Sequence, residues 1–307
     1  MVYDAVVVGL GPAGVCACVQ LKRSGFSVLG IEKEKIGGTL LDASYIENFP
    51  AFPGVVEAMD IVKNLEKSLA FHGVDVLFDE VQKVTKGREY FKLICRKCCV
   101  EARCVIIATG MVPMHLEGID GNNVFYRIRD VGDVSNKKIG IIGLGDTAFD
   151  AGLRFSELAS DVYILGRGKI KAVLPLVERA TRRKNMHVFE EVKIEKIENI
   201  NWQTKIVFID AGGQHTLLCD KLLICIGKTH ELGIISPTLM RKMKKEKFIS
   251  QELCSGLYIA GDVANPDARY LSVALGSGMK AAILASKYLR EEWKWKCLQK
   301  KAQNKMQ

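Results

Sequence analysis

Two glycine-rich segments carry the residue pattern with the clearest chemistry in this sequence. One reads Gly-Leu-Gly-Pro-Ala-Gly at residues 9–14, and the other reads Gly-Leu-Gly-Asp-Thr-Ala at residues 143–148. Between a strand and a helix, the first glycine of such a segment permits a tight turn and the second lets the backbone approach a pyrophosphate. The third small residue lets the helix pack on the strand, and the helix N-terminus offers amides to the phosphates. Each segment therefore predicts a dinucleotide site.

The residue that follows the second strand of each unit distinguishes the two sites. Glu32 ends the apolar run 27–31, about 20 residues after the first glycine segment, where an acid binds ribose hydroxyls. The second unit has no acid at the matching place and reads Gly-Arg-Gly-Lys-Ile-Lys at residues 166–171. A 2′-phosphate needs a cation there and is repelled by an acid. Arg167 and Lys171 therefore favour NADPH over NADH, and the alternative is that Lys169 and Lys171 are merely solvated.

The residues that flank the two glycine segments predict the strands and helices that position them. Tyr3–Val8 is an apolar run before the first segment, and Val15–Lys22 has helical composition after it. Ile139–Ile142 precedes the second segment, and a helix is expected to run on to about Leu158. The same order of strand, glycine turn, helix and strand thus occurs twice, which predicts an α/β fold with two Rossmann-like units. Further strands are expected at Val74–Leu77, Val81–Val84, Tyr90–Ile94, Cys104–Ile107, Val162–Leu165, Val192–Ile197, Lys205–Ile209, Lys221–Cys225 and Leu257–Ala260, and further helices at Val55–Phe71 and Ser272–Leu289.

Length and composition exclude several classes of protein. A chain of 307 residues favours two domains. Hydrophobic residues at 48% and charged residues at 26% exclude a disordered chain. We find no secretory signal and no apolar run of about 18 residues, so we expect no membrane association. Ten cysteines without an export signal predict reduced thiols and a cytoplasmic protein.

The net charge of +9 suggests a nucleic-acid partner, but its distribution argues against one. Residues 241–247 carry five bases and one acid, residues 287–307 carry seven bases and two acids, and residues 167–184 form a third basic stretch. Aromatic residues make up only 7%, and none is interleaved with the bases as a stacking platform requires. We therefore predict solvated basic faces and no nucleic-acid binding.

Further motifs give the sequence a specific family resemblance. Glu-Lys-Glu-Lys-Ile-Gly-Gly-Thr-Leu at 32–40 and Ile-Glu-Asn-Phe-Pro-Ala-Phe-Pro-Gly at 46–54 follow the first glycine segment. Val-Ile-Ile-Ala-Thr-Gly at 105–110 and Tyr-Ile-Ala-Gly-Asp-Val at 258–263 occur further on. In this order, and over essentially the whole chain, the motifs resemble the low-molecular-weight thioredoxin reductases of the pyridine nucleotide-disulfide oxidoreductase superfamily.

The resemblance implies an architecture and two cofactors. It implies an FAD-binding domain at residues 1–112 and 245–307, an NAD(P)H-binding domain at 113–244 inserted in it, and a homodimer. The FAD site would comprise Gly9, Gly11, Pro12, Ala13, Gly14, Glu32, Lys33, Gly38, Thr39, Asn48, Val81, Ala108, Thr109, Gly110, Gly261, Asp262 and Leu271. The site for NADPH, or NADH, would comprise Gly143, Gly145, Asp146, Thr147, Ala148, Arg167 and Lys171.

The sequence departs from the thioredoxin reductases at the redox disulfide. That family carries Cys-x-x-Cys just before the second glycine segment, where this chain reads Arg-Ile-Arg-Asp at 127–130. No cysteine occurs between Cys104 and Cys219. We therefore predict an enzyme whose flavin passes electrons directly to an external acceptor, namely a ferredoxin- or flavodoxin-like carrier, a small disulfide, a quinone or oxygen. Arg127 and Arg129 would face an acidic carrier, and Tyr270 would either screen the flavin or pack beside it.

We assign no catalytic side chain, because the isoalloxazine itself carries the chemistry and the five histidines form no constellation. Two alternatives stay open. Reduced ferredoxin, not NAD(P)H, would be the donor of a ferredoxin-fed flavoenzyme. A non-catalytic flavin-binding redox sensor or assembly partner would not turn over, although two intact glycine segments argue against such a loss of function.

The only Cys-x-x-Cys in the sequence is at Cys95 and Cys98. Its basic neighbours would lower the thiol pKa values, but the segment is predicted to form a hairpin tip on the adenine side of the FAD domain, away from the isoalloxazine. A zinc site needs four ligands, and Cys95, Cys98, Cys99 and Cys104 are irregularly spaced. We therefore predict no metal site.

Overall fold

The structure is a computed structural model that describes residues 2–119, 121–241 and 251–303. The chain forms two compact units. The first comprises Met1–Leu41, Tyr45–Met111 and His230–Gln307, and the second comprises Asp42–Ser44 and Val112–Thr229. The first unit is therefore assembled from segments that lie on both sides of the second unit in the sequence.

The chain returns to the first unit at His230. The sequence pattern predicts this return at residue 245, which lies outside the described residues, as do residues 242–247 of the basic stretch. Ile235 and Leu239 account for the early return, because both are buried in the core of the first unit. Ile235 also forms a parallel bridge with Val84 there.

A mostly parallel sheet is the frame of the first unit. Its strands follow the order β19-β20-β8-β1-β2-β5, and an antiparallel hairpin of β6 and β7 joins it through β8. The strands are β1 (Val2–Val8), β2 (Val28–Glu32), β5 (Asp75–Phe78), β6 (Val81–Lys86), β7 (Phe91–Cys95), β8 (Cys99–Ile107), β19 (Glu252–Cys254) and β20 (Leu257–Ile259). The inner strands β1 and β2 are apolar almost throughout, as expected where both faces of a sheet are covered.

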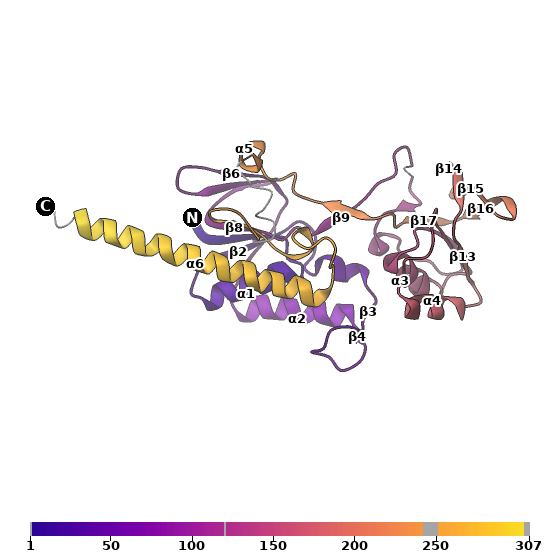
Figure 1. Cartoon of the computed structure of the whole chain (residues 1–307), viewed down its shortest axis with the longest axis horizontal. Coiled ribbons are helices and arrows are strands. Elements are labelled where there is room, and N and C mark those ends of the chain that lie inside the picture. The colour runs from indigo at the N-terminus through magenta and orange to yellow at the C-terminus, as the bar shows by residue number, and fades with distance from the viewer. Residues whose placement is uncertain (1, 120, 242–250, 304–307) are drawn as a thin grey trace. The chain divides into compact units, whose positions relative to one another are not determined.

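Helices cover one face of this sheet, and the hairpin covers the other (Figure 1). The helices α1 (Pro12–Arg23), α2 (Ala58–Phe71) and α6 (Leu271–Gln303) pack over a core that includes Val7, Leu21 and Ala281. The opposite core includes Val6 and Leu93 and is joined by the short helix α5 (Pro237–Met240). Smaller elements of this part of the chain are η1 (Gly38–Asp42), β3 (Tyr45–Ile46), β4 (Val56–Glu57) and η4 (Gly261–Val263).

The second unit repeats the layered plan around a five-stranded parallel sheet. Its order is β10-β17-β11-β12-β13, with β10 (Val124–Phe125), β11 (Lys138–Ile142), β12 (Asp161–Leu165), β13 (Met186–Phe189) and β17 (Lys221–Ile224). The helices α3 (Asp146–Phe155) and α4 (Leu174–Thr181) pack on one face. An antiparallel sheet of β14 (Lys193–Ile200), β15 (Gln203–Asp210) and β16 (Gly213–Cys219) packs on the other. The turn η2 (Ile128–Asp130) precedes β11, and β9 (Met111–Pro113) pairs with β18 (Lys228–His230) where the chain passes between the units.

The predicted α/β fold with two strand–glycine–helix–strand units is confirmed. The sequence pattern misses α4, β13, β16 and β19, among other short elements, and it ends the strand that begins at Lys221 at Cys225, whereas β17 ends at Ile224. Most residues of β13 and β16 are exposed or half-buried, so the apolar signal of a buried strand is weak there. No helix in the described ranges is long and apolar enough to cross a membrane.

Candidate functional site

The first glycine segment lies at the carboxyl end of β1, and packing explains two of its glycines. Gly9 has φ +94°, and a Cβ there would lie 2.4 Å from the carbonyl oxygen of Ala108. A Cβ on Gly14 would lie 1.8 Å from the carbonyl oxygen of Gly9. Only glycine fits these two positions, and together they seat the start of α1 against the end of β1.

The middle glycine has no such packing role. A Cβ on Gly11 would come no nearer than 3.7 Å to any neighbour, and that neighbour is the backbone of Gly38. Gly11 is also the N-cap of α1, and no side chain caps this helix end. Bare backbone from two segments and uncapped helix amides form a cradle that suits a pyrophosphate, so the residues present fit the phosphates of a dinucleotide.

Glu32 ends β2 beside this cradle. Its carboxylate is 9% exposed and accepts hydrogen bonds from the amides of Leu10, at 2.8 Å, and Glu34, at 3.0 Å. These two bonds fix the carboxylate and leave further lone pairs for ribose hydroxyls, as the sequence position predicts. The neighbouring Lys33 pairs with Glu231 at 3.0 Å.

The other residues predicted to contact FAD all belong to the first unit, and their exposure differs from one residue to the next. Ala108 and Gly261 follow β8 and β20, so they share the edge formed by the carboxyl ends of the parallel strands with Gly9. Open α/β sheets bind ligands at this edge. The Thr109 hydroxyl donates to the carbonyl of Glu231 at 3.0 Å. Val81 and Leu271 are buried, whereas Thr39, Asn48 and Tyr270 are exposed. These placements leave the predicted roles of the residues as predictions.

Sequence reasoning misses two residues of α6 that hold this edge together. A Cβ on Gly278 would lie 2.1 Å from the carbonyl oxygen of Ala13, so α6 and α1 approach closely at the glycine segment. The Ser277 hydroxyl accepts a hydrogen bond from the amide of Gly261 at 2.9 Å. The detectable signal is Gly-Ser-Gly at 276–278 inside a helical pattern, because glycine within a helix often marks close packing.

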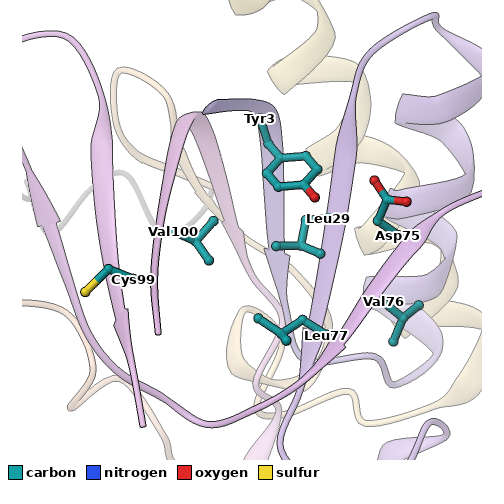
Figure 2. Close-up of a pocket in the computed structure, with 7 residues that line it drawn as sticks. All are labelled: Tyr3, Leu29, Asp75, Val76, Leu77, Cys99 and Val100. Atoms are coloured by element: carbon teal, nitrogen blue, oxygen red, sulfur yellow. The ribbon is translucent and has the colours of Figure 1, made fainter. Parts of the chain in front are cut away.

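A hollow of about 460 Å³ opens elsewhere on the first unit (Figure 2). It is lined by side chains from β1, β2, β5 and β8, among them Tyr3, Asp75 and Cys99. Burial and the neighbouring Asp75 carboxylate raise the pKa of Tyr3. None of the predicted cofactor residues lines this hollow, so we do not assign it to a cofactor.

The second glycine segment shows the same division of roles. Gly143 has φ +138°, and a Cβ there would lie 2.3 Å from the carbonyl oxygen of Cys225. A Cβ on Gly145 would meet nothing within 4 Å. Gly145 is the N-cap of α3, again with no side-chain cap. The open space above Gly145 and the uncapped amides suit a second pyrophosphate.

The basic loop after β12 lies against this segment. The amide of Lys171 donates to the carbonyl of Leu144 at 2.8 Å, and the side chains of Arg167 and Lys171 are exposed. Asp146 at the start of α3 accepts a hydrogen bond from the amide of Val173 at 2.9 Å, which ties the far end of the same loop to the helix. The structure therefore brings together the glycine segment and the predicted cations.

The segment Arg127–Asp130 belongs to the second unit. Ile128 is 5% exposed and packs in the core of the second unit. The amide of Arg129 donates to the carboxylate of Asp42 at 3.1 Å, and its side chain lies 3.8 Å from the same carboxylate. Burial raises the pKa values of two cysteines of this unit, Cys219 and Cys225, to about 12. Their thiols therefore stay protonated at neutral pH, where a thiolate would be the reactive form.

Comparison with known proteins decides the family. The sequence matches the pyridine nucleotide-disulphide oxidoreductase family over residues 3–286. The chain belongs to this family. A ferredoxin–NADP reductase from Ignicoccus hospitalis is 31% identical to it over 304 residues, covering 94% of this chain and 98% of that protein. A thioredoxin reductase from Bacillus subtilis is 27% identical over 313 residues, covering 94% of this chain and 96% of that protein.

Solved structures agree with the fold. The thioredoxin reductase of Lactococcus lactis matches with a TM-score of 0.85 at 24% identity, covering 94% of this chain and 99% of that chain. The chain is accordingly a flavin-dependent NAD(P)H oxidoreductase of the thioredoxin reductase type, with FAD and NAD(P)H as its cofactors. The predicted family, enzyme class and cofactors are thus confirmed.

Proposed function

We propose that this oxidoreductase moves electrons from NAD(P)H through FAD directly to an acceptor outside the polypeptide, without an internal disulfide. The observation that carries the proposal is the segment Arg127–Asp130, which holds no cysteine and which, by the resemblance in motif order, corresponds to the redox cysteines of thioredoxin reductases. Ile128 is buried and Arg129 is hydrogen-bonded to Asp42, so both residues have a packing role. The protonated thiols of Cys219 and Cys225 offer no substitute within the second unit.

The residues around each cradle would divide the work. Gly11, Gly38 and the uncapped start of α1 would hold the FAD pyrophosphate, and Glu32 would hold its ribose. The Gly145 segment would hold the nicotinamide nucleotide, with Arg167 and Lys171 selecting a 2′-phosphate. Bound FAD supplies the redox chemistry, accepting a hydride and donating electrons, and the protein orients it.

A small acidic electron carrier of the ferredoxin or flavodoxin type is the acceptor that we favour. The relative at 31% identity is a ferredoxin–NADP reductase, and a further relative, 24% identical, is described as a protein in a rubredoxin operon of Clostridium pasteurianum. The chain is basic overall, at +9, and opposite charges steer the encounter of two proteins. A homodimer in the cytoplasm would complete this proposal.

An anaerobic reductive titration tests the internal step. Without a redox disulfide, about one NADPH per FAD bleaches the flavin fully, because only the flavin takes up a hydride. A thioredoxin reductase with its disulfide consumes about two, since the disulfide takes up a second pair of electrons. Uptake of two equivalents would therefore overturn the proposal, and the same titration with NADH compares the two donors.

A carrier assay tests the external step. We expect the reduced enzyme to reduce ferredoxin faster than it reduces thioredoxin, with a rate that falls steeply as salt is added. Arg127→Ala should weaken the salt dependence and leave NADPH-driven bleaching unchanged. A rate that is independent of salt would refute electrostatic docking, and rapid reduction of thioredoxin or of a small disulfide would replace the favoured acceptor.

A further inference from the structure

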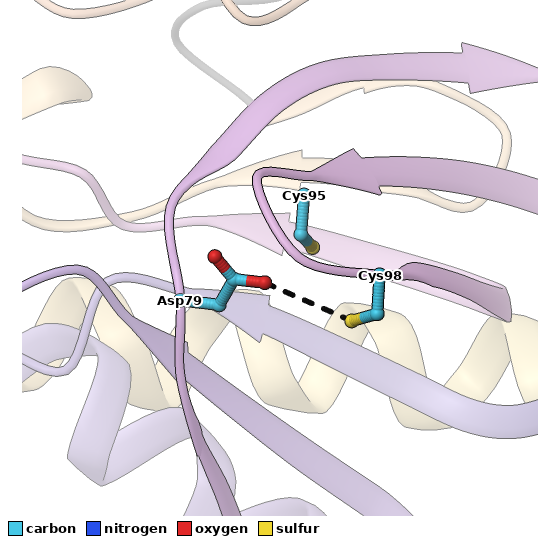
Figure 3. A group of neighbouring side chains, drawn as sticks. All are labelled: Asp79, Cys95 and Cys98. Atoms are coloured by element: carbon cyan, nitrogen blue, oxygen red, sulfur yellow. Dashed lines mark hydrogen bonds between the residues drawn. The ribbon is translucent and has the colours of Figure 1, made fainter.

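The tip of the β7–β8 hairpin brings three possible metal ligands together at the end of β5 (Figure 3). They are the carboxylate of Asp79 and the thiols of Cys95 and Cys98, whose ligand atoms all lie within 4.8 Å of one another. Within the ranges that the structure describes, this is the one such group of three or more. None of the three residues belongs to the proposed FAD or NAD(P)H sites.

This ligand group differs from the four cysteines that were the candidate zinc ligands in the sequence. The irregular spacing of the four cysteines Cys95, Cys98, Cys99 and Cys104 predicts no metal site. In the structure, Cys104 is not a candidate ligand, because it is fully buried in β8 and lies outside the ligand group. The structure adds Asp79, which follows β5 and is brought to the hairpin by the fold alone. The ligand set changes from four irregularly spaced cysteines to a Cys-x-x-Cys pair with one carboxylate.

The geometry suits a tetrahedral thiophilic cation. Zinc bonds of about 2.3 Å to sulfur and about 2.0 Å to oxygen place neighbouring sulfur and oxygen ligands roughly 3.5 Å apart. The observed distance between Asp79 Oδ2 and Cys98 Sγ is 3.8 Å. The amide of Cys95 donates to the carbonyl of Cys98 at 2.9 Å, so the tight turn holds both thiols on one side of the hairpin tip. Only small shifts would close the site around an ion.

The carboxylate is already oriented for this role. Asp79 is 5% exposed, and its two oxygens accept hydrogen bonds from the amides of Glu80, at 2.8 Å, and Lys97, at 3.0 Å. Hydrogen bonds of this kind commonly fix the carboxylates that ligate metals. The Cys98 thiol donates to Asp79 Oδ2 as well. Metal binding takes the thiolate form of Cys98, which frees that lone pair, so the two amide bonds orient the ligand without blocking it.

We propose that Asp79, Cys95 and Cys98 form a site for one divalent cation of the zinc class, with a fourth position open to water beside the exposed Cys98. The ion would fasten the hairpin to the end of β5. The amide of Asp79 donates to the carbonyl of Glu32 at 3.0 Å, and Val81 pairs with Cys95 across the hairpin. The ion would therefore stiffen the strand ends next to two of the residues predicted to contact FAD.

Cys99 provides a matched control within the same hairpin. It is exposed like Cys98 and adjacent to it, but successive side chains of a strand point to opposite faces. Cys99 lines the hollow beside Tyr3 (Figure 2), and its thiol does not belong to the ligand group. Cys98→Ser removes a proposed ligand, whereas Cys99→Ser removes a neighbouring thiol of the same class.

The experiment uses the flavin-bound protein with its thiols reduced, after metal has been stripped with a chelator. We expect one Zn²⁺ per chain to bind in competition with a chromophoric chelator, and Co²⁺ to give the thiolate charge-transfer absorption of a cysteine-ligated ion. Cys98→Ser should weaken binding at least ~10-fold and abolish that absorption, since even supporting residues of a metal site contribute that much. Asp79→Asn should weaken binding and keep the absorption, because both thiolates remain.

The control fixes the interpretation. Cys99→Ser should bind both ions as the unaltered protein does. Absence of Zn²⁺ binding to the unaltered protein, or equal weakening by Cys98→Ser and Cys99→Ser, would overturn the proposal. Flavin absorption of each variant shows that it is folded, so a lost ion is distinguished from a lost structure.

Discussion

Alanine substitutions at Gly143 and Gly145 add the same methyl group two residues apart, with opposite consequences. Gly145 adopts φ −96° and ψ 177°, an extended conformation open to alanine, and its Cβ would meet nothing within 4 Å. Gly143 has φ +138°, and its Cβ would lie 2.3 Å from the carbonyl oxygen of Cys225. The pair therefore separates the demands of packing from those of ligand binding.

The magnitudes follow from these surroundings. For Gly143→Ala, a strained backbone and an overpacked contact together cost about 2–4 kcal/mol of folding free energy. Gly145→Ala leaves the fold unstrained. Restriction of the unfolded chain favours the variant by about 0.5 kcal/mol, and the loss of glycine at the N-cap of α3 offsets that gain, so the free energy of unfolding stays nearly unchanged. In the proposed site, however, its methyl group displaces the pyrophosphate. Loss of one charge-assisted hydrogen bond costs about 1.5–3 kcal/mol, roughly a 10- to 150-fold loss of affinity for NADPH.

Two measurements on each variant check this reasoning. Thermal unfolding should show a lower transition for Gly143→Ala and an unchanged or slightly higher one for Gly145→Ala. Anaerobic flavin reduction over a range of NADPH concentrations should show a raised apparent Kd for Gly145→Ala with its flavin still bound. Wild-type affinity for NADPH in Gly145→Ala would refute the placement of the nucleotide over this glycine.

Three further variants probe other parts of the molecule. Glu32→Gln turns an amide group toward one of two donating backbone amides, so FAD should dissociate roughly tenfold more readily, as measured by flavin retained after dialysis. Replacement of Arg167 and Lys171 by Ala should lower the preference for NADPH over NADH by about tenfold or more, as measured by the kcat/KM ratio of the two donors; an unchanged ratio would contradict the proposed role of this loop. Although burial raises the pKa of Asp4, hydrogen bonds from Ser27 and Arg103 outweigh it and hold the pKa below its ordinary value. The stabilisation by the ionised Asp4 carboxylate is therefore present at neutral pH and lost as the pH falls below about 4. Asp4→Asn should lower the unfolding free energy by about 1 kcal/mol near neutral pH and very little in acid. An equal loss at both pH values would show that Asp4 does not titrate as proposed.

The glycine segments could be predicted from sequence because their determinants are local. Apolar runs flank each segment directly, and Glu32 follows at the spacing that a ribose contact requires. The strand–glycine–helix units and their order in the chain therefore appear where they are expected. Arg167 and Lys171 could also be predicted as candidate nucleotide contacts, since they lie shortly after the second strand of their unit.

Contacts between distant segments could not be predicted in this way. Gly278 meets Ala13 only because α6 packs across α1. Asp79 reaches Cys98 only because the hairpin folds back over the end of β5. In β16, Leu217 and Cys219 are buried, but the apolar Leu218 between them is exposed, so the sequence shows no clean alternation of apolar and polar residues there. These features depend on the fold as a whole, whereas the glycine segments depend on their immediate neighbours.

The order of segments in the first unit has a consequence for biosynthesis. The second half of β8, Val105–Ile107, pairs with β20 at Leu257–Ile259, so one edge of this half-strand has no partner until the ribosome has added some 150 more residues. At roughly 5–20 residues per second, this takes about 8–30 s. The intervening unit, Val112–Thr229, is complete only 28 residues before Leu257 is added. An apolar strand edge is thus presented to other chains throughout that interval, and the nascent protein is prone to aggregate, and in need of a chaperone, mainly while its inserted unit is still being synthesised.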